Sequence, residues 1–175
     1  MDNKYTIGGI LMTNTDKNLA AAFAGESQAN RKYLAFAKQA DAEGHKQVAK
    51  LFRAAAEAET IHAHAHLKAM GAIKSTQENL KAAVAGETYE YKEMYPPFIT
   101  EAKAENNAAA IRTFELANGA EKVHADLYQK YYDNMNNLTE TDLYLCTICG
   151  HIHEGSAPDK CPICGAKAMA YKKVD

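Results

Sequence analysis

The feature that most constrains the fold is a pair of metal-ligand motifs, each of which occurs twice. An Ala-Gly-Glu cassette followed by a hydroxyl residue places Glu26 and Glu87 61 positions apart. A Glu-x-x-His motif also recurs, 62 positions apart, as Glu59 with His62 and as Glu121 with His124. The order Glu, Glu-x-x-His, Glu, Glu-x-x-His predicts that the chain contains two copies of one helical hairpin.

Helical periodicity runs from about residue 15 to residue 135 with almost no strand signal. It predicts four helices, over residues 16–41, 46–70, 75–106 and 108–134. Ser75 and Glu78 have the spacing of a capping box at the third helix start, and Pro96 with Pro97 predicts a kink inside that helix. Helices of about 25 residues, each about 38 Å long, joined by short turns predict an all-α four-helix bundle.

The repeated motifs predict a carboxylate-rich metal site. In Glu-x-x-His the two side chains are three residues apart and therefore share one face of a helix. Two such helices, with one Glu from each remaining helix, give the ligand set of a di-iron or di-manganese bundle. Several glutamates brought together would repel one another without cations. A single Glu-x-x-His motif would be weak evidence, since exposed helices are rich in Glu, but two at matched spacing favour a metal site.

Three further side chains belong to the candidate site. Glu90 lies one turn after Glu87, whereas the matching position after Glu26 is Ala29, so Glu90 is an extra carboxylate without a counterpart. We expect it to be a ligand rather than an exposed glutamate. Tyr33 and Tyr95 are candidates for hydrogen bonds to ligand carboxylates, with packing in the helical core as the alternative for both.

The C-terminal segment contains all four cysteines, in two Cys-x-x-Cys-Gly motifs separated by 11 residues. Four thiolates on two tight turns predict a tetrahedral site for iron or zinc. Its ligands are Cys146, Cys149, Cys161 and Cys164. Because every cysteine is used, no free thiol remains for thiol-based redox catalysis. The two readings of the site are a one-electron iron centre and a zinc ribbon that only folds the segment.

These patterns divide the chain into an N-terminal extension (1–14), the helical domain (15–135), a polar linker (136–142) and a small metal-binding domain of short β-strands and turns (143–175). The last is too short to fold without a metal or a partner. A net charge of −2 argues against nucleic acid as a partner. With no membrane-length apolar run and no signal-peptide pattern, we expect a cytoplasmic protein that does not bind membranes.

With these motifs, the sequence resembles the rubrerythrin family, in which a ferritin-like di-iron domain precedes a rubredoxin-like Fe(Cys)4 domain. The resemblance rests on "AFAGESQA", "EAETIH", "GETYEYKEMYP" and the two Cys-x-x-Cys-Gly motifs, and it covers the chain from about residue 15 onward. It implies that Glu59 and Glu121 bridge two non-haem irons and that His124 is a permanent ligand. It also implies that Glu90 and His62 exchange on the other iron. The mid-helix Gly119 departs from the family pattern.

The activity implied by the resemblance is reduction of hydrogen peroxide to water in defence against oxidative stress. Electrons would come from a rubredoxin or an NAD(P)H-dependent reductase through the Fe(Cys)4 centre. The resemblance also implies a homodimer in which the tail of one subunit serves the helical domain of the other. Two alternatives are a ferroxidase or oxidase that handles iron, and a structural metal-binding protein with a zinc tail.

Overall fold

A computed structural model of the chain describes residues 6–7, 10–11 and 13–175. Near the N-terminus, strands β1 (Thr6–Ile7) and β2 (Ile10–Leu11) pair antiparallel. The rest of the expected extension, up to residue 12, lies outside the described residues. Thr13 then caps helix α1 (Asn14–Ala42) through a capping box with Asp16, an arrangement that satisfies N–H groups at the helix start.

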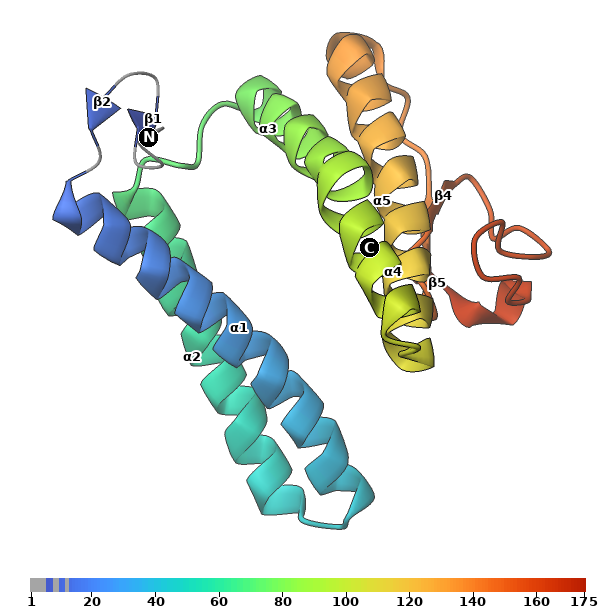
Figure 1. Cartoon of the computed structure of the whole chain (residues 1–175), viewed down its shortest axis with the longest axis horizontal. Helices are drawn as coiled ribbons and strands as arrows, with labels where there is room; N and C mark the ends of the chain where they lie inside the picture. The colour runs from blue at the N-terminus through green and yellow to red at the C-terminus, as the bar shows by residue number, and fades with distance from the viewer. Residues whose placement is uncertain (1–5, 8–9, 12) are drawn as a thin grey trace. The chain divides into compact units, whose positions relative to one another are not determined.

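The first hairpin consists of α1 and α2 (Lys46–Ala69), which lie side by side (Figure 1). Gly44, with φ +85°, makes the reversal between them in a backbone conformation that favours glycine. The interface is built from small side chains, which let two helices approach closely; its buried alanines are Ala37, Ala40, Ala49, Ala56 and Ala63. Across it, the buried Asn30 amide donates to the Ala56 carbonyl (2.7 Å) and to the Thr60 hydroxyl (2.8 Å).

The second hairpin packs α3 (Thr76–Tyr89) and α4 (Tyr95–Ala104) against α5 (Ala108–Asn134), as Figure 1 shows. The capping box expected at Ser75 and Glu78 is confirmed. The expected third helix is instead three segments, because a π-helical turn, η1 (Glu90–Met94), separates α3 from α4. The interruption anticipated at the two prolines therefore lies just before them, and both fall in the first turn of α4, where a missing N–H is tolerated.

The π turn accounts for a shift in the internal repeat. Glu26 and Glu87 are 61 positions apart, but downstream of the turn the offset is 62, so the second hairpin contains one extra residue. A π turn adds one residue to a helix without breaking it. Each hairpin also contains a cluster of three aromatic rings, and matching rings of the two clusters are 62 positions apart in the sequence. The rings are Tyr33, Phe36 and Phe52 in the first hairpin and Tyr95, Phe98 and Phe114 in the second. The distances between ring centroids are 6.4, 6.1 and 5.5 Å in the first cluster and 6.3, 6.1 and 5.7 Å in the second. This agreement supports the duplication.

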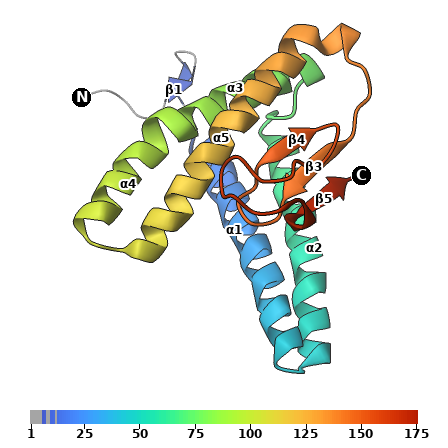
Figure 2. The same cartoon turned by 90° about the vertical axis from the view of Figure 1, so that its right-hand side faces the viewer.

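After the short 3₁₀ turn η2 (Met135–Asn137), the C-terminal segment forms an antiparallel sheet in the order β4-β3-β5. The strands are β3 (Leu143–Cys146), β4 (Ile152–Glu154) and β5 (Tyr171–Val174), and the 3₁₀ turn η3 (Ala168–Ala170) precedes β5. Tyr144 pairs with His153 on one side and with Lys173 on the other. The sheet lies beside α5 (Figure 2), and the second hairpin and the C-terminal segment form one compact unit, residues 75–175.

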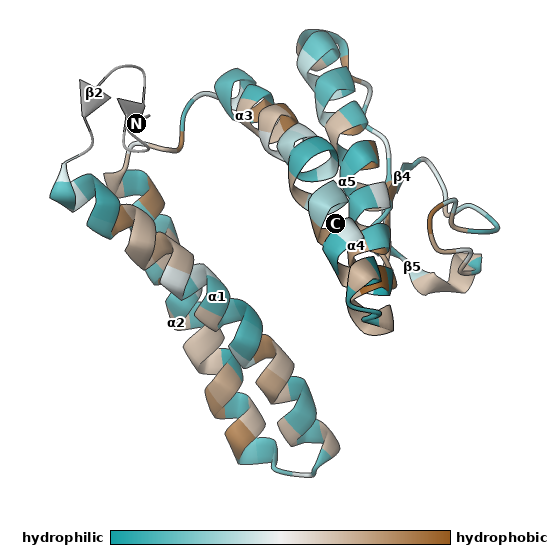
Figure 3. Cartoon of the chain, viewed as in Figure 1, coloured by the Kyte–Doolittle hydropathy of each residue, from teal (hydrophilic) through white to brown (hydrophobic). Residues whose placement is uncertain are grey.

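Hydrophilic and hydrophobic residues are mixed along every helix in Figure 3. Accordingly, none of the helices in the described part of the chain is long and apolar enough to cross a membrane. The expected fold class, a helical protein with a small C-terminal domain of short strands, is confirmed.

Candidate metal centres

In the first hairpin, α1 and α2 bring together Glu26, Glu59 and His62, with ligand atoms within 4.8 Å of one another. His62 Nδ1 lies 2.9 Å from Glu59 Oε2 and 4.0 Å from Glu26 Oε1. The hydrogen bond from His62 holds the pKa of Glu59 below its usual value of 4.5. The His62 side chain is 54% exposed, against 16% for His124 in the second hairpin, so of the two imidazoles His62 has more room to move.

In the second hairpin, α3 and α5 bring together Glu87, Glu121 and His124, also within 4.8 Å. His124 Nδ1 lies 2.7 Å from Glu121 Oε2 and 3.6 Å from Glu87 Oε2. The other ring nitrogen, Nε2, donates to the carbonyl of Gly150 at 2.9 Å. A histidine that holds a metal commonly donates its second N–H to a backbone carbonyl, which fixes the ring and its tautomer. The contact therefore leaves Nδ1 as the nitrogen that faces the carboxylates.

The donor chemistry of both groups fits a divalent cation. With Nε2 protonated, a neutral His124 would place the lone pair of Nδ1 against a carboxylate oxygen only 2.7 Å away. Two acceptors at that distance repel unless a proton or a cation lies between them. One imidazole with two carboxylates is a ligand set suited to iron, manganese or zinc. Each hairpin thus supplies one such set, as its repeated motif predicts.

The electrostatics around the second group reflect crowded carboxylates. Burial raises the pKa of Glu87, and the neighbouring Glu121 raises it further. Burial also raises the pKa of Glu90, with a contribution from the charge of Glu87. Glu90, at the start of the π turn, is close enough to respond to Glu87 and His124 but lies outside the close ligand group. The structure therefore places the extra carboxylate beside the group rather than in it.

The two tyrosines of the sequence prediction occupy equivalent places in the two hairpins. Burial raises the pKa of Tyr95, as do the charges of Glu121, Glu90 and Glu87, so its hydroxyl stays protonated beside the carboxylates. In an ideal α-helix, Tyr95 would lie on a different face from Glu87. The extra residue of the π turn rotates Tyr95 back toward the face that carries Glu87. Tyr33 packs against Phe52, with ring centroids 6.1 Å apart.

The four cysteines form a compact cluster on two turns of the C-terminal domain. Cys146 Sγ lies 3.7 Å from Cys164 Sγ, and Cys149 Sγ lies 3.5 Å from Cys161 Sγ. A tetrahedral site with metal–sulfur bonds of about 2.3 Å requires sulfur atoms about 3.8 Å apart. Gly150 and Gly165, with φ of +82° and +73°, end the two turns in the left-handed region. The cluster has the size and chemistry of the predicted tetrahedral site.

A hydrogen-bonded pair beside the cysteines was not anticipated from the sequence. The Tyr171 hydroxyl lies 2.7 Å from Nδ1 of the buried His151 and hydrogen-bonds to Cys161. Burial raises the pKa of Cys161, but this bond and the backbone N–H groups of Cys164 and Ile163 lower it to about 6. Asn30 was also missed, although its place four residues after Glu26 puts it on the ligand face.

Comparison with known proteins agrees with both halves of this description. The model of the rubrerythrin family matches residues 17–132, and that of the rubrerythrin rubredoxin-like domain matches residues 144–172. The chain belongs to the rubrerythrin family. As a rubrerythrin-family protein it is an oxidoreductase with a di-iron site and a rubredoxin-like Fe(Cys)4 site, for which the two carboxylate–histidine groups and the cysteine cluster provide ligands.

Among its relatives are two proteins of Nitratidesulfovibrio vulgaris. The chain is 38% identical to nigerythrin, over 93% of this chain and 85% of the relative. It is 35% identical to rubrerythrin, over 87% of this chain and 90% of the relative. A solved structure of partially reduced nigerythrin covers 99% of this chain and 90% of its own, at 37% identity and a TM-score of 0.58. The rubrerythrin architecture therefore extends over nearly the whole chain.

Proposed function

We propose that this rubrerythrin-family protein is a non-haem di-iron peroxidase that reduces hydrogen peroxide to water in defence against oxidative stress. The observation that carries the proposal is the hydrogen bond from His124 Nε2 to the Gly150 carbonyl. It joins a ligand candidate of the helical domain to the first cysteine turn. A ferroxidase would have no use for a redox centre at this place, and a purely structural zinc tail would not need contact with a ligand histidine.

Peroxide reduction consumes two electrons and two protons, breaks the O–O bond and yields two water molecules. The bound iron pair would supply both electrons at once, and the Fe(Cys)4 centre would restore them singly. The chain's own residues hold the ligands in place for this chemistry. The Gly150 carbonyl orients His124, and the Asn30 amide locks α1 to α2 one turn before Glu59. Protonated Tyr95 can donate a hydrogen bond to the carboxylates around it.

The proposal includes an exchange of ligands between Glu90 and His62 as the iron changes charge. Exchange requires that one ligand can leave while another stands ready nearby. The exposed His62 side chain and the placement of Glu90 beside, but not within, the Glu87 group support this. The deeper His124, held on both ring nitrogens, is suited to remain in place.

Electrons would enter at the C-terminal domain from a rubredoxin or from an NAD(P)H-dependent reductase. The family resemblance further suggests that the protein works as a homodimer, and the sequence, in which neither a membrane-length apolar run nor a signal-peptide pattern is found, suggests a location in the cytoplasm. Its small net charge and its mixture of acidic and basic residues argue against a nucleic acid as partner.

The test is a steady-state assay of peroxide consumption under anaerobic conditions, with iron-loaded protein and reduced rubredoxin as donor. We expect turnover by the wild-type protein and at least about a tenfold loss in Glu59→Gln, because even the loss of a group that supports a metal ligand commonly costs about 10–100-fold. Glu57→Gln is the matched control, since Glu57 is exposed on the same helix. Oxidation of iron by dioxygen without turnover of peroxide would contradict the proposal and support the ferroxidase alternative.

A further inference from the structure

His151 and Tyr171 lie on the face of the small sheet that carries the cysteines. Tyr171 begins β5 and pairs directly with Cys146 at the end of the central strand β3. On the other side of β3, the Cys146 N–H donates to the carbonyl of His151 at 2.8 Å, immediately before β4 begins. The central strand therefore holds His151 and Tyr171 on either side of one of the four cysteines.

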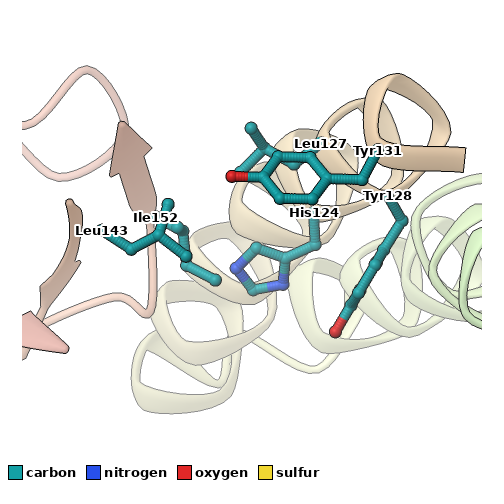
Figure 4. A pocket seen from close by; sticks show the side chains of 6 residues that line it. All are labelled: His124, Leu127, Tyr128, Tyr131, Leu143 and Ile152. Carbon is teal, nitrogen blue, oxygen red and sulfur yellow. The ribbon is translucent and has the colours of Figure 1, made fainter. Parts of the chain in front are cut away.

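The alternation of side chains along a strand sends the next residue to the opposite face of the sheet. Ile152, which follows His151, lines a pocket together with Leu143 of β3, as Figure 4 shows. His151 and Tyr171 are on the face away from that pocket. Their rings meet edge to face, with centroids 6.0 Å apart and planes at 88°, and the Tyr171 hydroxyl lies 2.7 Å from His151 Nδ1.

The Tyr171 hydroxyl has two polar neighbours but only one hydrogen. It hydrogen-bonds to the Cys161 sulfur as well as to His151 Nδ1. A cysteine that holds a metal is deprotonated, so its sulfur can only accept. The bond to Cys161 therefore uses the tyrosine hydrogen, and His151 Nδ1 must donate to the tyrosine oxygen. With a hydrogen on Nε2 alone, Nδ1 would instead take the tyrosine hydrogen away from the sulfur.

We propose that His151 is a positioning residue for the Fe(Cys)4 centre: by donating from Nδ1, it orients the Tyr171 hydroxyl toward the Cys161 sulfur and so raises the reduction potential of the iron. Hydrogen bonds to the sulfur ligands tune the potential of such centres, because the reduced centre carries more negative charge. A hydroxyl that accepts a hydrogen bond also donates a stronger one. Backbone N–H groups of Ile163 and Cys164 already reach this sulfur, and the tyrosine adds a third donor.

Every residue in this arrangement belongs to the C-terminal domain. The tuning of the potential therefore does not depend on which subunit's helices the domain serves, and it does not rest on the proposed peroxidase function.

The hydrogen on the His151 ring can be located in the full-length protein loaded with zinc, which is diamagnetic. Long-range proton–nitrogen correlations in NMR spectra distinguish a ring that carries a hydrogen on Nδ1 from one that carries it on Nε2 alone. The His151 signals are identified by their loss in His151→Phe. We expect a hydrogen on Nδ1. A bare Nδ1 would show that the imidazole accepts from Tyr171 and would overturn the proposal.

The effect on the iron is measured by spectroelectrochemistry of the full-length, iron-loaded protein. His151→Phe retains an aromatic ring but cannot donate. We expect the equilibrium constant for reduction to fall by up to about fivefold, the contribution of one hydrogen bond, which is about 40 mV for a one-electron couple. His151→Asn keeps an N–H donor and should recover part of this loss. If the imidazole draws the tyrosine hydrogen away from the sulfur, His151→Phe would raise the potential; that result, or an unchanged potential, would contradict the proposal.

A double variant separates positioning from a direct effect of the imidazole. Because His151 acts through Tyr171, adding His151→Phe to Tyr171→Phe should lower the potential no further. A further fall would mean that the imidazole acts on the iron by itself, and it would refute the positioning role.

His153→Phe is the matched control. The His153 ring lies 6.1 Å from that of His151, and its buried Nδ1 has no hydrogen-bond partner among the described residues. Its removal should leave the potential unchanged. A fall as large as that in His151→Phe would assign the effect to the loss of any imidazole from this face and would contradict the specific role of His151. All variants should retain the visible absorption of the oxidised Fe(Cys)4 centre, which verifies that the site is loaded.

Discussion

Neutralising Glu87 should change the stability of the protein in opposite directions with and without metal. Without metal, the Glu87 and Glu121 carboxylates face each other with ligand atoms within 4.8 Å. Two unit charges at that distance repel by about 1 kcal/mol in water and about 3 kcal/mol at an effective dielectric constant of about 20. Both side chains are roughly one-fifth exposed and His124 lies between them, so the low end applies. Glu87→Gln should therefore stabilise the metal-free protein by about 1 kcal/mol, which raises Tm by about 2–4 °C.

With metal, the same variant should lose stability relative to the wild-type protein. A ligand at about 100 times its Kd stabilises the folded state by about 2.7 kcal/mol, equivalent to about 5–10 °C in Tm for a chain of this size. Glu87→Gln removes one oxygen ligand, so most of this increase should disappear.

The pH dependence provides a second check of the same interaction. Burial and Glu121 raise the pKa of Glu87 above 4.5. The folded state therefore retains this proton to higher pH than the unfolded state, and the stability of the metal-free protein falls as pH rises from 4.5 through the raised pKa. Glu87→Gln should remove that part of the decline.

The assay is differential scanning calorimetry under anaerobic conditions, with iron(II) removed from or added to the helical domain. Glu115→Gln is the control, because it breaks an exposed ion pair with Lys103 and should cost at most about 1 kcal/mol in both states. A lower Tm for metal-free Glu87→Gln, or an undiminished response to iron(II), would refute the reasoning.

Three further predictions concern the tail and the helix start. Tyr171→Phe removes a hydrogen-bond donor to the Cys161 sulfur and so removes some stabilisation of the reduced iron centre. Spectroelectrochemistry should show that the reduction potential of the C-terminal iron falls by about 40 mV for each kcal/mol of stabilisation lost. An unchanged potential would mean that this hydrogen bond does not stabilise the reduced centre. Cys164→Ser should leave the C-terminal domain unfolded, because so short a segment needs its metal to fold. Limited proteolysis should then remove this domain while the circular dichroism signal of the helices persists. A protease-resistant C-terminal domain would show that it folds by packing alone. Ser75→Ala breaks the capping box and should lower the free energy of unfolding by about 1 kcal/mol in urea titrations, whereas no change would mean that water replaces the cap.

Local sequence signals predicted the elements that depend on local structure. The ends of α5 agree with the expected 108–134, and Ser75 caps α3 as its spacing with Glu78 indicated. These succeed because caps and helical periodicity are determined by residues within one or two turns. The Glu-x-x-His pairs and the two Cys-x-x-Cys turns could be identified in the same way, because the members of each motif lie on one helix face or on one tight turn.

Features that depend on helix register or on distant contacts were not predictable in the same way. A prediction that assumes 3.6 residues per turn cannot locate the extra residue of the π turn. In the sequence, the sign of that residue is the change of the repeat offset from 61 to 62. Gly119 was visible as a weak point in a helix, but its neighbour Ile163 is 44 positions away. The residues next to a glycine in a helix interior do not identify the distant side chain that packs against it. Tyr171 and His151 were missed for the same reason, since the sheet brings them together.

The central claim, that the two metal centres cooperate in peroxide reduction, is tested most directly by stopped-flow absorbance on iron-loaded, fully reduced protein. The protein is mixed anaerobically with hydrogen peroxide in one experiment and with dioxygenated buffer in another. The account predicts that peroxide reoxidises the protein much faster than dioxygen, and that the visible band of the Fe(Cys)4 centre returns together with that of the di-iron site. Faster reaction with dioxygen, or oxidation of the di-iron site while the tail stays reduced, would contradict it.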